Sequence, residues 1–383
     1  MGIFGMPEKQ LLYIKELDAL RFFAVSGVML SHWSRDIQKL SFLIPVSSYL
    51  ANCGVNLFFV LSGFLITKIL LVNRDQENKG FVLRQFYGRR FLRIFPLYYL
   101  VLLICIAFNV PEARRYDGWL FTYTSNIIIA LTPGKVGYMG HFWSLAVEEQ
   151  FYIFFPFIIL FTGKRYHIKL FYILIATAMI SRAVSYFIFS DKIVAGWVAN
   201  SFTNCCFDCF AIGSLLAYYS LYRTEKLRKI LKFDFLFIFF GLGGSLTCYL
   251  LSLAGSNPLA AMILMRFLFA CFCFWLIGNA NEGYFTGIFR KILQNKVLIY
   301  LGKISYGLYV YHFFMTYIFS YFNFPFKTYL YPVVTIGLAA ASWQFYESPI
   351  NNLKKYISYK KRKPENLSGK LIIDNNVDIE SIR

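Results

Sequence analysis

The feature that most constrains this chain is a series of apolar runs of about 20 residues, separated by short polar stretches. A helix of that length rises about 30 Å, which matches the hydrocarbon core of a bilayer. An outer-membrane barrel would instead show short segments of alternating hydrophobicity, which this sequence lacks. The chain is also 58% hydrophobic, far above a soluble domain. The sequence therefore predicts an all-α, polytopic transmembrane helical bundle.

We predict about ten spans in this bundle. They cover residues 16–33, 48–72, 92–109, 142–162, 168–189, 204–221, 233–253, 259–278, 301–320 and 328–347. Residues 1–350 would form the membrane-embedded domain. Residues 351–383 would form a basic cytoplasmic tail, too charged and too poor in aromatic residues to fold. We expect the first run to be a retained span, since it lacks the small-residue cleavage site of a signal peptide.

The basic residues are distributed unevenly around these spans. Of the 39 Lys and Arg residues, 28 fall on one side and 7 on the other when the spans alternate across the membrane. Cytoplasmic loops are enriched in Lys and Arg, so the richer side and both termini are predicted to be cytoplasmic. This distribution accounts for the net charge of +19 without nucleic-acid binding.

The eight cysteines lie mostly inside the predicted spans. Cys205, Cys206 and Cys209 form a group with no second cysteine pair and no nearby histidine. We interpret them as small buried hydrophobic side chains rather than as metal ligands. We expect no metal and no permanently bound cofactor.

Two ionisable residues, Arg21 and His32, lie in the first apolar run. At about 100° per residue they share one helix face, about 16 Å apart along the axis. Ionisable groups in lipid normally face a protein interior or an aqueous cavity, which favours a functional site. The alternative is a snorkelling arginine near one interface and an interfacial histidine near the other.

A polar stripe opens the fourth run, where Ser144, Glu148 and Tyr152 recur four residues apart. Helical rise places Glu148 about 10 Å below the outer surface, a depth comparable to that of His32. Packing alone does not explain a carboxyl group at this depth, so we favour a functional role.

Three arginines stand at the inner mouth of the third run, Arg89, Arg90 and Arg93. Arg90 and Arg93 are three residues apart and share a helix face, so their planar cations would suit phosphate groups. The alternative is ordinary positive-inside topology, which also places basic residues there.

Four further candidate site residues lie inside later runs, and each has two explanations. Arg182 and Asp208 lie in the outer parts of successive spans, where they can form a structural ion pair or contact a polar substrate. Arg266 has the same two alternatives. His312 is placed near mid-membrane in a tyrosine-rich segment, as a base that competes with His32 or as a buried imidazole satisfied by its neighbours.

In combination these residues resemble the acyltransferase-3 family of integral membrane acyltransferases, which includes O-acetyltransferases of bacterial surface polysaccharides. The resemblance runs from about Glu16 to Pro349. Its motifs are Arg21 with His32, Gly-Val-Asn-Leu-Phe-Phe-Val-Leu-Ser-Gly-Phe, Arg90-Phe-Leu-Arg93, Trp-Ser-Leu-Ala-Val-Glu148-Glu-Gln-Phe-Tyr and Ser-Tyr-Gly-Leu-Tyr-Val-Tyr-His312. Gly307 stands where the family often has proline, a departure that bears on helix geometry.

The resemblance implies transfer of an acyl group, usually acetyl, from cytoplasmic acetyl-CoA or another acyl-CoA to a carbohydrate hydroxyl. The acceptor would be a cell-surface or exported polysaccharide, or its lipid-linked precursor, at a bacterial inner membrane. His32 becomes the leading catalytic base, with Glu148 and Arg21 beside it, and Arg89, Arg90 and Arg93 become candidate donor ligands. The candidate acceptor-binding or supporting residues are Ser144, Tyr152, Arg182, Asp208, Arg266 and His312. Some relatives carry a further hydrolase-like domain, which we do not expect here.

Two other functional classes stay open at this stage. Ten spans with scattered charges also suit a transporter or flippase for a lipid-linked sugar. A non-catalytic partner in polysaccharide export is the third class. The sequence also leaves open the acyl group, direct transfer against an acyl-histidine relay, and the oligomeric state.

Overall fold

The computed structural model describes residues 13–256, 258–322 and 327–359 of the chain. In these ranges every regular element is a helix and no strand occurs, which confirms the predicted helical class. Among the described residues, seven helical segments are long and apolar enough to cross a membrane. They are Leu40–Asn73, Lys79–Ala107, Gly137–Phe161, Lys164–Ile188, Thr203–Tyr222, Asp234–Leu253 and Pro258–Glu282. These segments coincide with the second to the eighth predicted spans.

The first and the last two predicted spans are also helical, as α1 (Lys15–Asp36), α17 (Ser305–Tyr321) and α18 (Lys327–Ser342). They are not among the segments that qualify by length and composition. The structure therefore shows a multi-pass helical protein. The count of ten spans and the side of the termini stay predictions.

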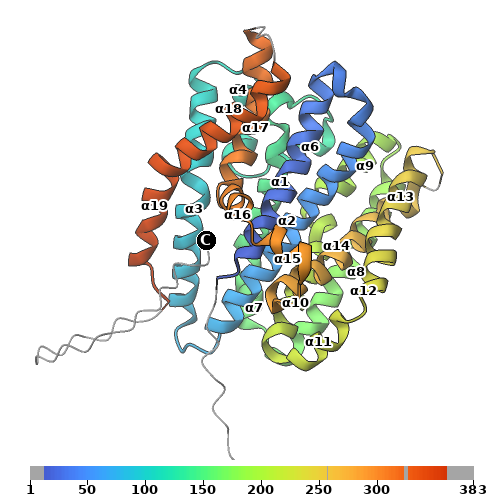
Figure 1. Ribbon diagram of the computed structural model, residues 1–383, viewed down its shortest axis with the longest axis vertical. Helices are drawn as coiled ribbons and strands as arrows, with labels where there is room; N and C mark the ends of the chain where they lie inside the picture. Colours follow the sequence, from blue (N-terminus) through green and yellow to red (C-terminus); the bar gives the residue numbers. More distant parts are fainter. Residues whose placement is uncertain (1–12, 257, 323–326, 360–383) are drawn as a thin grey trace, which may run out of the picture.

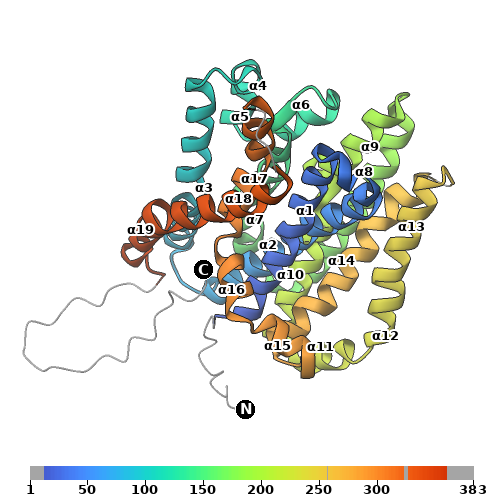
Figure 2. The ribbon, with the colours of Figure 1, turned by 45° about the horizontal axis from the view of Figure 1, so that its top comes forward.

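The helix α2 (Ile44–Asn73) lies at the centre of the bundle. It packs against α1 on one side and α10 (Phe207–Tyr222) on the other. In Figures 1 and 2 the blue helices α1 and α2 separate an orange and red group, α17 to α19, from a green and yellow group, α8 to α14. A polar side chain on α1 or α2 can therefore face a protein interior rather than lipid.

The remaining helices surround this centre. Their bounds are Lys79–Ala107 for α3, Trp143–Phe161 for α7, His167–Ile188 for α8, Asp234–Leu236 for α12, Gly244–Leu253 for α13, Pro258–Glu282 for α14, Lys296–Lys303 for α16 and Ser348–Asn352 for α19. The segment between the third and fourth predicted spans folds into short helices at one end of the bundle, where Figure 1 also shows α9. They are α4 (Pro111–Arg115), α5 (Asp117–Phe121), α6 (Ser125–Leu131) and α9 (Lys192–Ser201).

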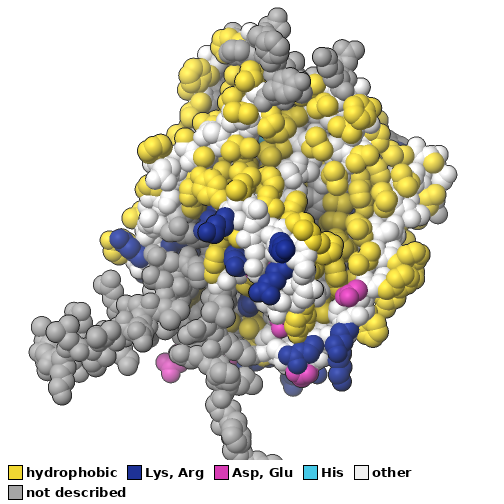
Figure 3. All heavy atoms as spheres, in the orientation of Figure 1, with side chains coloured by type: hydrophobic (Ala, Val, Ile, Leu, Met, Phe, Trp, Pro, Cys, Tyr) yellow, Lys and Arg dark blue, Asp and Glu magenta, His cyan; other side chains and the backbone are white. Residues whose placement is uncertain are grey.

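The opposite end carries α11 (Thr224–Leu231) and α15 (Gly287–Leu293). Figure 3 shows that the Lys and Arg side chains on this face lie in its lower half, where these two helices are. Hydrophobic side chains cover most of the upper half. This separation has the form that the positive-inside rule produces.

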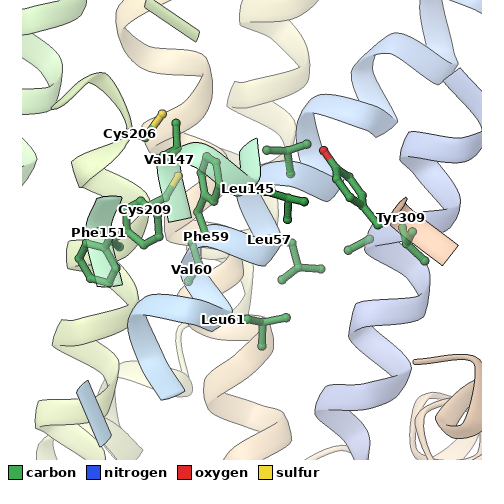
Figure 4. Close-up of a cluster of buried hydrophobic side chains, with 14 of the residues drawn as sticks. Leu57, Phe59, Val60, Leu61, Leu145, Val147, Phe151, Cys206, Cys209 and Tyr309 are labelled. Carbon is green, nitrogen blue, oxygen red and sulfur yellow. The ribbon is translucent and has the colours of Figure 1, made fainter. Parts of the chain in front are cut away.

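The core between α2, α7 and α10 consists of aliphatic and aromatic side chains (Figure 4). Phe210 stacks on Phe151 with ring centroids 4.0 Å apart and lies 5.0 Å from the ring of Phe59. Cys206 and Cys209 are buried in this cluster as free thiols, as the sequence predicted. No group of His, Cys, Asp or Glu within the described ranges could hold a metal ion.

Small residues allow α2 and α10 to approach each other closely. A Cβ at Gly63 would collide with the backbone carbonyl of Phe210, and a Cβ at Gly213 would collide with that of Val60. The contact is reciprocal, so both helices need a glycine where their backbones meet.

The Gly63→Ala substitution should therefore lower the stability of the bundle. The added methyl group forces the two backbones apart, and overpacking of this kind costs about 1–3 kcal/mol. Thermal unfolding of the detergent-purified protein measures the effect. Gly196→Ala in α9 is the matched control, because nothing lies within 4 Å of its Cβ. Equal melting temperatures for Gly63→Ala and the parent would contradict the close approach.

Candidate functional site

A cavity of about 100 Å³ lies between α1, α2, α3, α7 and α17. Its volume is sufficient for several water molecules or for part of a ligand of comparable volume. Its charged and hydroxyl-bearing lining residues are Arg21, Ser62, Arg90, Arg93, Ser144, Glu148, Glu149, Tyr152, Ser305, Tyr306 and Tyr309. The structure thus brings residues from the predicted catalytic and donor-binding sets to one space.

The cationic side of the cavity contains three arginines. Arg21 donates to Asp18 at 2.5 Å, so its charge is paired. Arg90 and Arg93 form no hydrogen bond and no ion pair with any described residue, although the guanidinium of Arg90 lies 5.0 Å from the ring centroid of Tyr152. Two unpaired guanidinium groups on one helix can bind an anion through several charge-assisted hydrogen bonds.

Arg89 points away from this cavity. Its guanidinium donates to the carbonyl oxygens of Lys354, at 3.1 Å, and Ile357, at 2.9 Å. It also lies 6.0 Å from the ring centroid of Tyr359. The structure therefore separates Arg89 from Arg90 and Arg93, and its contacts hold residues 354–359 against α3.

The acidic side of the cavity contains Glu148, whose two oxygens have different partners. Ser62 donates to Oε1 at 2.9 Å, and the Tyr152 hydroxyl lies 3.2 Å from Oε2. Ser62 and Tyr152 are also within 2.9 Å of each other. Glu148 therefore holds a hydroxyl pair, and the residue that contacts the imidazole of His32 is a different one.

His32 is paired with His312. Nδ1 of His32 lies 2.8 Å from Nε2 of His312, and Nδ1 of His312 lies 2.6 Å from the carbonyl oxygen of Tyr309. A carbonyl oxygen can only accept, so Nδ1 of His312 carries a proton. In a neutral imidazole Nε2 of His312 then accepts, and the proton between the rings belongs to Nδ1 of His32.

This assignment leaves Nε2 of His32 as the nitrogen with a lone pair. Nε2 of His32 has no hydrogen bond within the described part of the chain. The ring is fixed by stacking on Phe313, with centroids 4.3 Å apart, and Trp33 donates to the carbonyl oxygen of His312 at 3.3 Å. An oriented imidazole with a free lone pair can act as a base or as a nucleophile.

Tyr309 connects the histidine pair with the cavity. Its ring is part of the cavity lining, its hydroxyl donates to the carbonyl oxygen of His141 at 2.7 Å, and its own carbonyl oxygen accepts from His312. Ser144 lies 2.6 Å from the Tyr309 hydroxyl and completes this end of the cavity. His32 is not a lining residue, so Tyr309 stands between the cavity and the base.

The predicted Arg182 and Asp208 pair is present at 2.7 Å, away from the cavity. Arg182 also donates to the carbonyl oxygens of Cys205 and Ile263. Arg266 donates to the carbonyl oxygens of Cys205 and Asn200 and to Oδ1 of Asn200. These partners favour the structural explanation, because the two guanidinium groups satisfy the carbonyl groups where α9 meets α10.

Several residues at the site were not among the predicted ones. They are Ser62, His141, Glu149, Ser305, Tyr306 and Tyr309. Tyr309 and His312 are three residues apart, the spacing at which a helical side chain can reach the carbonyl of the preceding turn. That spacing was the available signal for the orientation of His312.

Relatives of this chain come from Staphylococcus aureus. A protein of strain COL named "Putative O-acetyltransferase" is 28% identical over 389 residues, which cover 89% of this chain and 58% of that protein. O-acetyltransferase OatA of strain NCTC 8325 is 25% identical over 367 residues, 88% of this chain and 57% of OatA. The chain thus spans less than three fifths of the length of these relatives. No solved structure matches it.

The family comparison covers most of the chain. The sequence model of the acyltransferase domain, acyltransferase-3, matches residues 14–347. That interval contains every helix that forms the cavity and both members of the histidine pair. On this match, the chain belongs to the acyltransferase-3 family of membrane proteins.

Proposed function

We propose that this protein is a membrane O-acyltransferase of a bacterial inner membrane. It would move an acyl group, acetyl in our proposal, from cytoplasmic acyl-CoA to a hydroxyl of a cell-surface or exported polysaccharide or its lipid-linked precursor. The observation that carries the proposal is the oriented His32 and His312 pair next to a cavity with two unpaired arginines. The family supports acyl transfer, and the names of the relatives, which are O-acetyltransferases, support acetyl as the acyl group.

The negative charge of the donor indicates where in the cavity it would bind. The nucleotide end of CoA is anionic and would bind Arg90 and Arg93, which need a counter-charge. Along α7, Tyr152 lies beside Arg90 and Ser144 lies beside Tyr309, about 12 Å away by helical rise. A donor bound with its phosphates at Arg90 therefore extends its thioester towards Tyr309, behind which lies His32.

The chemical step uses Nε2 of His32. It accepts the proton of the acceptor hydroxyl while the oxygen attacks the thioester carbonyl carbon, and the collapse of the intermediate breaks the carbon–sulfur bond. The thiolate leaves with the electron pair and takes the proton from the imidazolium. His312 keeps accepting from Nδ1 throughout and so holds the ring. An acyl-histidine relay would use the same nitrogen as nucleophile.

The side chain of Tyr309 must move for this reaction to occur. In the structure its hydroxyl is engaged by His141 and Ser144, and its ring closes the cavity towards the histidines. We expect the ring to shift when the thioester arrives, since His32 has no other described contact with the cavity. Product release would let the two hydrogen bonds of the hydroxyl form again.

We propose ten spans with both termini in the cytoplasm. Contacts at the two ends of the described chain support this arrangement. Gln294 donates to Glu16 at 2.7 Å, and Gln76 donates to the carbonyl oxygen of Tyr359 at 3.2 Å. Both glutamines belong to segments predicted to be cytoplasmic, so in this proposal Glu16 and Tyr359 would also lie on the cytoplasmic side.

Reporter fusions would test this topology. A fusion after Asn78 should behave as cytoplasmic and a fusion after Gly134 as extracytoplasmic, because α3 lies between them and crosses the bilayer once. Paired alkaline phosphatase and fluorescent-protein reporters measure the two locations. The same location for both fusions would refute the arrangement.

Alanine at Arg90 or Arg93 should weaken acyl-CoA binding. Each change removes charge-assisted hydrogen bonds to phosphate, worth about 1.5–3 kcal/mol. Lysine should restore only part of the affinity, because it keeps the charge and loses the planar fork. Calorimetric titration of the purified protein with CoA gives the affinities. Arg228→Ala, at an exposed side chain of α11, is the control. If folded Arg90→Ala and Arg93→Ala proteins bind CoA with parental affinity, the assignment of these two arginines to the donor site is wrong.

The His32→Ala protein should bind donor and lose transfer by roughly 10²–10⁴-fold, the usual contribution of a general base. Labelled acetyl moving from acetyl-CoA to glycan in proteoliposomes is the measurement. His167→Gln, at the one histidine outside this site, is the control. His312→Ala should lower kcat and leave the KM for the donor nearly unchanged. The substitution removes the hydrogen bond that orients His32, but it does not alter the residues that line the cavity.

The same variants can be tested for O-acetylation of surface glycans in cells. A deletion strain complemented with the parental gene should regain O-acetylated surface glycan by mass spectrometry, and His32→Ala should not complement. Near-parental turnover in His32→Ala together with an inactive His312→Ala protein would make His312 the base. Movement of glycan across the bilayer with no acetyl transfer would support a transporter instead.

A further inference from the structure

Glu149 is a second carboxyl group in the cavity lining, and no described residue forms a hydrogen bond or an ion pair with it. It follows Glu148 on α7, lines the same space and is 6% exposed. Oε1 is fully buried without a hydrogen bond, and no ion pair within the described ranges includes Glu149. Leaving such a group unsatisfied costs free energy, so an occupant of the cavity is the expected partner.

The neighbouring tyrosines do not supply this partner. Tyr98 and Tyr306 lie within electrostatic reach of Glu149. Tyr98 donates to the carbonyl oxygen of Leu120 at 2.8 Å, and Tyr306 donates to that of Ile94 at 2.7 Å. Their protons are therefore committed to the backbone. The Tyr123 hydroxyl also lies within electrostatic reach of Glu149, but it is buried without a hydrogen bond of its own. No described residue therefore donates to Glu149 in this structure, and an occupant of the cavity can supply the donor.

The position of Glu149 along the cavity identifies the kind of donor. Tyr152, near Arg90, marks the cationic end, and Ser144, near Tyr309, marks the end next to the histidines. Glu149 lies between them on the same helix. A ligand with phosphates at one end and a thioester at the other passes Glu149 with its middle portion. In acyl-CoA that portion is the pantetheine arm, an uncharged chain with two amide N–H groups.

We propose that the carboxyl group of Glu149 accepts a hydrogen bond from an amide N–H of the pantetheine arm. This assignment rests on the proposed function, since it takes acyl-CoA as the donor. Glu149 would hold the arm in register, so that the thioester stops at the Tyr309 end rather than short of it. The subsite would recognise CoA and ignore a nucleotide that lacks the arm.

Two ligands separate the arm from the nucleotide. CoA carries both, whereas adenosine 3′,5′-bisphosphate carries only the phosphates. Calorimetric titration of Glu149→Leu should show CoA bound at least about tenfold more weakly and the bisphosphate bound as in the parent. Glu149→Gln keeps a neutral acceptor and should lose about fivefold for CoA. Arg90→Ala should weaken both ligands.

Thr335→Val is the matched control, because the Thr335 hydroxyl is also buried without a partner but lies outside the cavity lining. It should leave both affinities unchanged. Glu149→Gln is nearly isosteric and keeps the test available if Glu149→Leu does not fold.

Parental CoA affinity in both Glu149 variants would overturn the assignment and leave water as the partner of this carboxyl group. Equal weakening of both ligands would overturn it too, because it would indicate a general distortion. An unchanged CoA affinity together with a raised KM for the acceptor would overturn the assignment and indicate that Glu149 binds the acceptor sugar instead. If the parental protein bound neither ligand, the proposed function itself would fail.

Discussion

The hydrogen-bonded chain from the Tyr309 carbonyl through His312 to His32 is the interaction on which the site depends. It fixes which nitrogen of each ring carries a proton, and so leaves Nε2 of His32 with its lone pair. In the proposed reaction, the second imidazole would have the orienting role that a carboxylate has in a hydrolase triad. Because His312 carries no negative charge, the pair can be buried without the cost of an unpaired anion.

The buried arginines differ in whether their guanidinium groups have hydrogen-bond partners, and this difference separates those that we interpret as structural from those that we propose as ligand-binding. Backbone carbonyls and Asp208 or Asn200 accept hydrogen bonds from the terminal nitrogens of Arg182 and Arg266, and only the buried Nε of Arg182 lacks a partner among the described residues. Arg90 and Arg93 line a cavity with no hydrogen-bond partner among the described residues. In an apolar environment that difference is large in free energy, and it is the reason that we propose the cavity as the ligand site.

Close helix packing makes this arrangement possible. α2 carries Ser62 towards the cavity and, one residue later, Gly63 against α10. On α1 the carbonyl of Asp18, the partner of Arg21, lies against Gly302 of α16. Larger residues at these glycines would separate the helices and with them the groups that line the cavity.

The sequence by itself determined the helical class, the central spans and the stripe of Ser144, Glu148 and Tyr152, because apolar run length and a period near 3.6 are local properties. Only the tertiary structure decided that His32 pairs with His312 rather than with Glu148, and that Arg89 turns away from Arg90. His32 and His312 are 280 positions apart. Such contacts depend on which helix faces meet and which rotamers fill the space between them, and no local pattern specifies either.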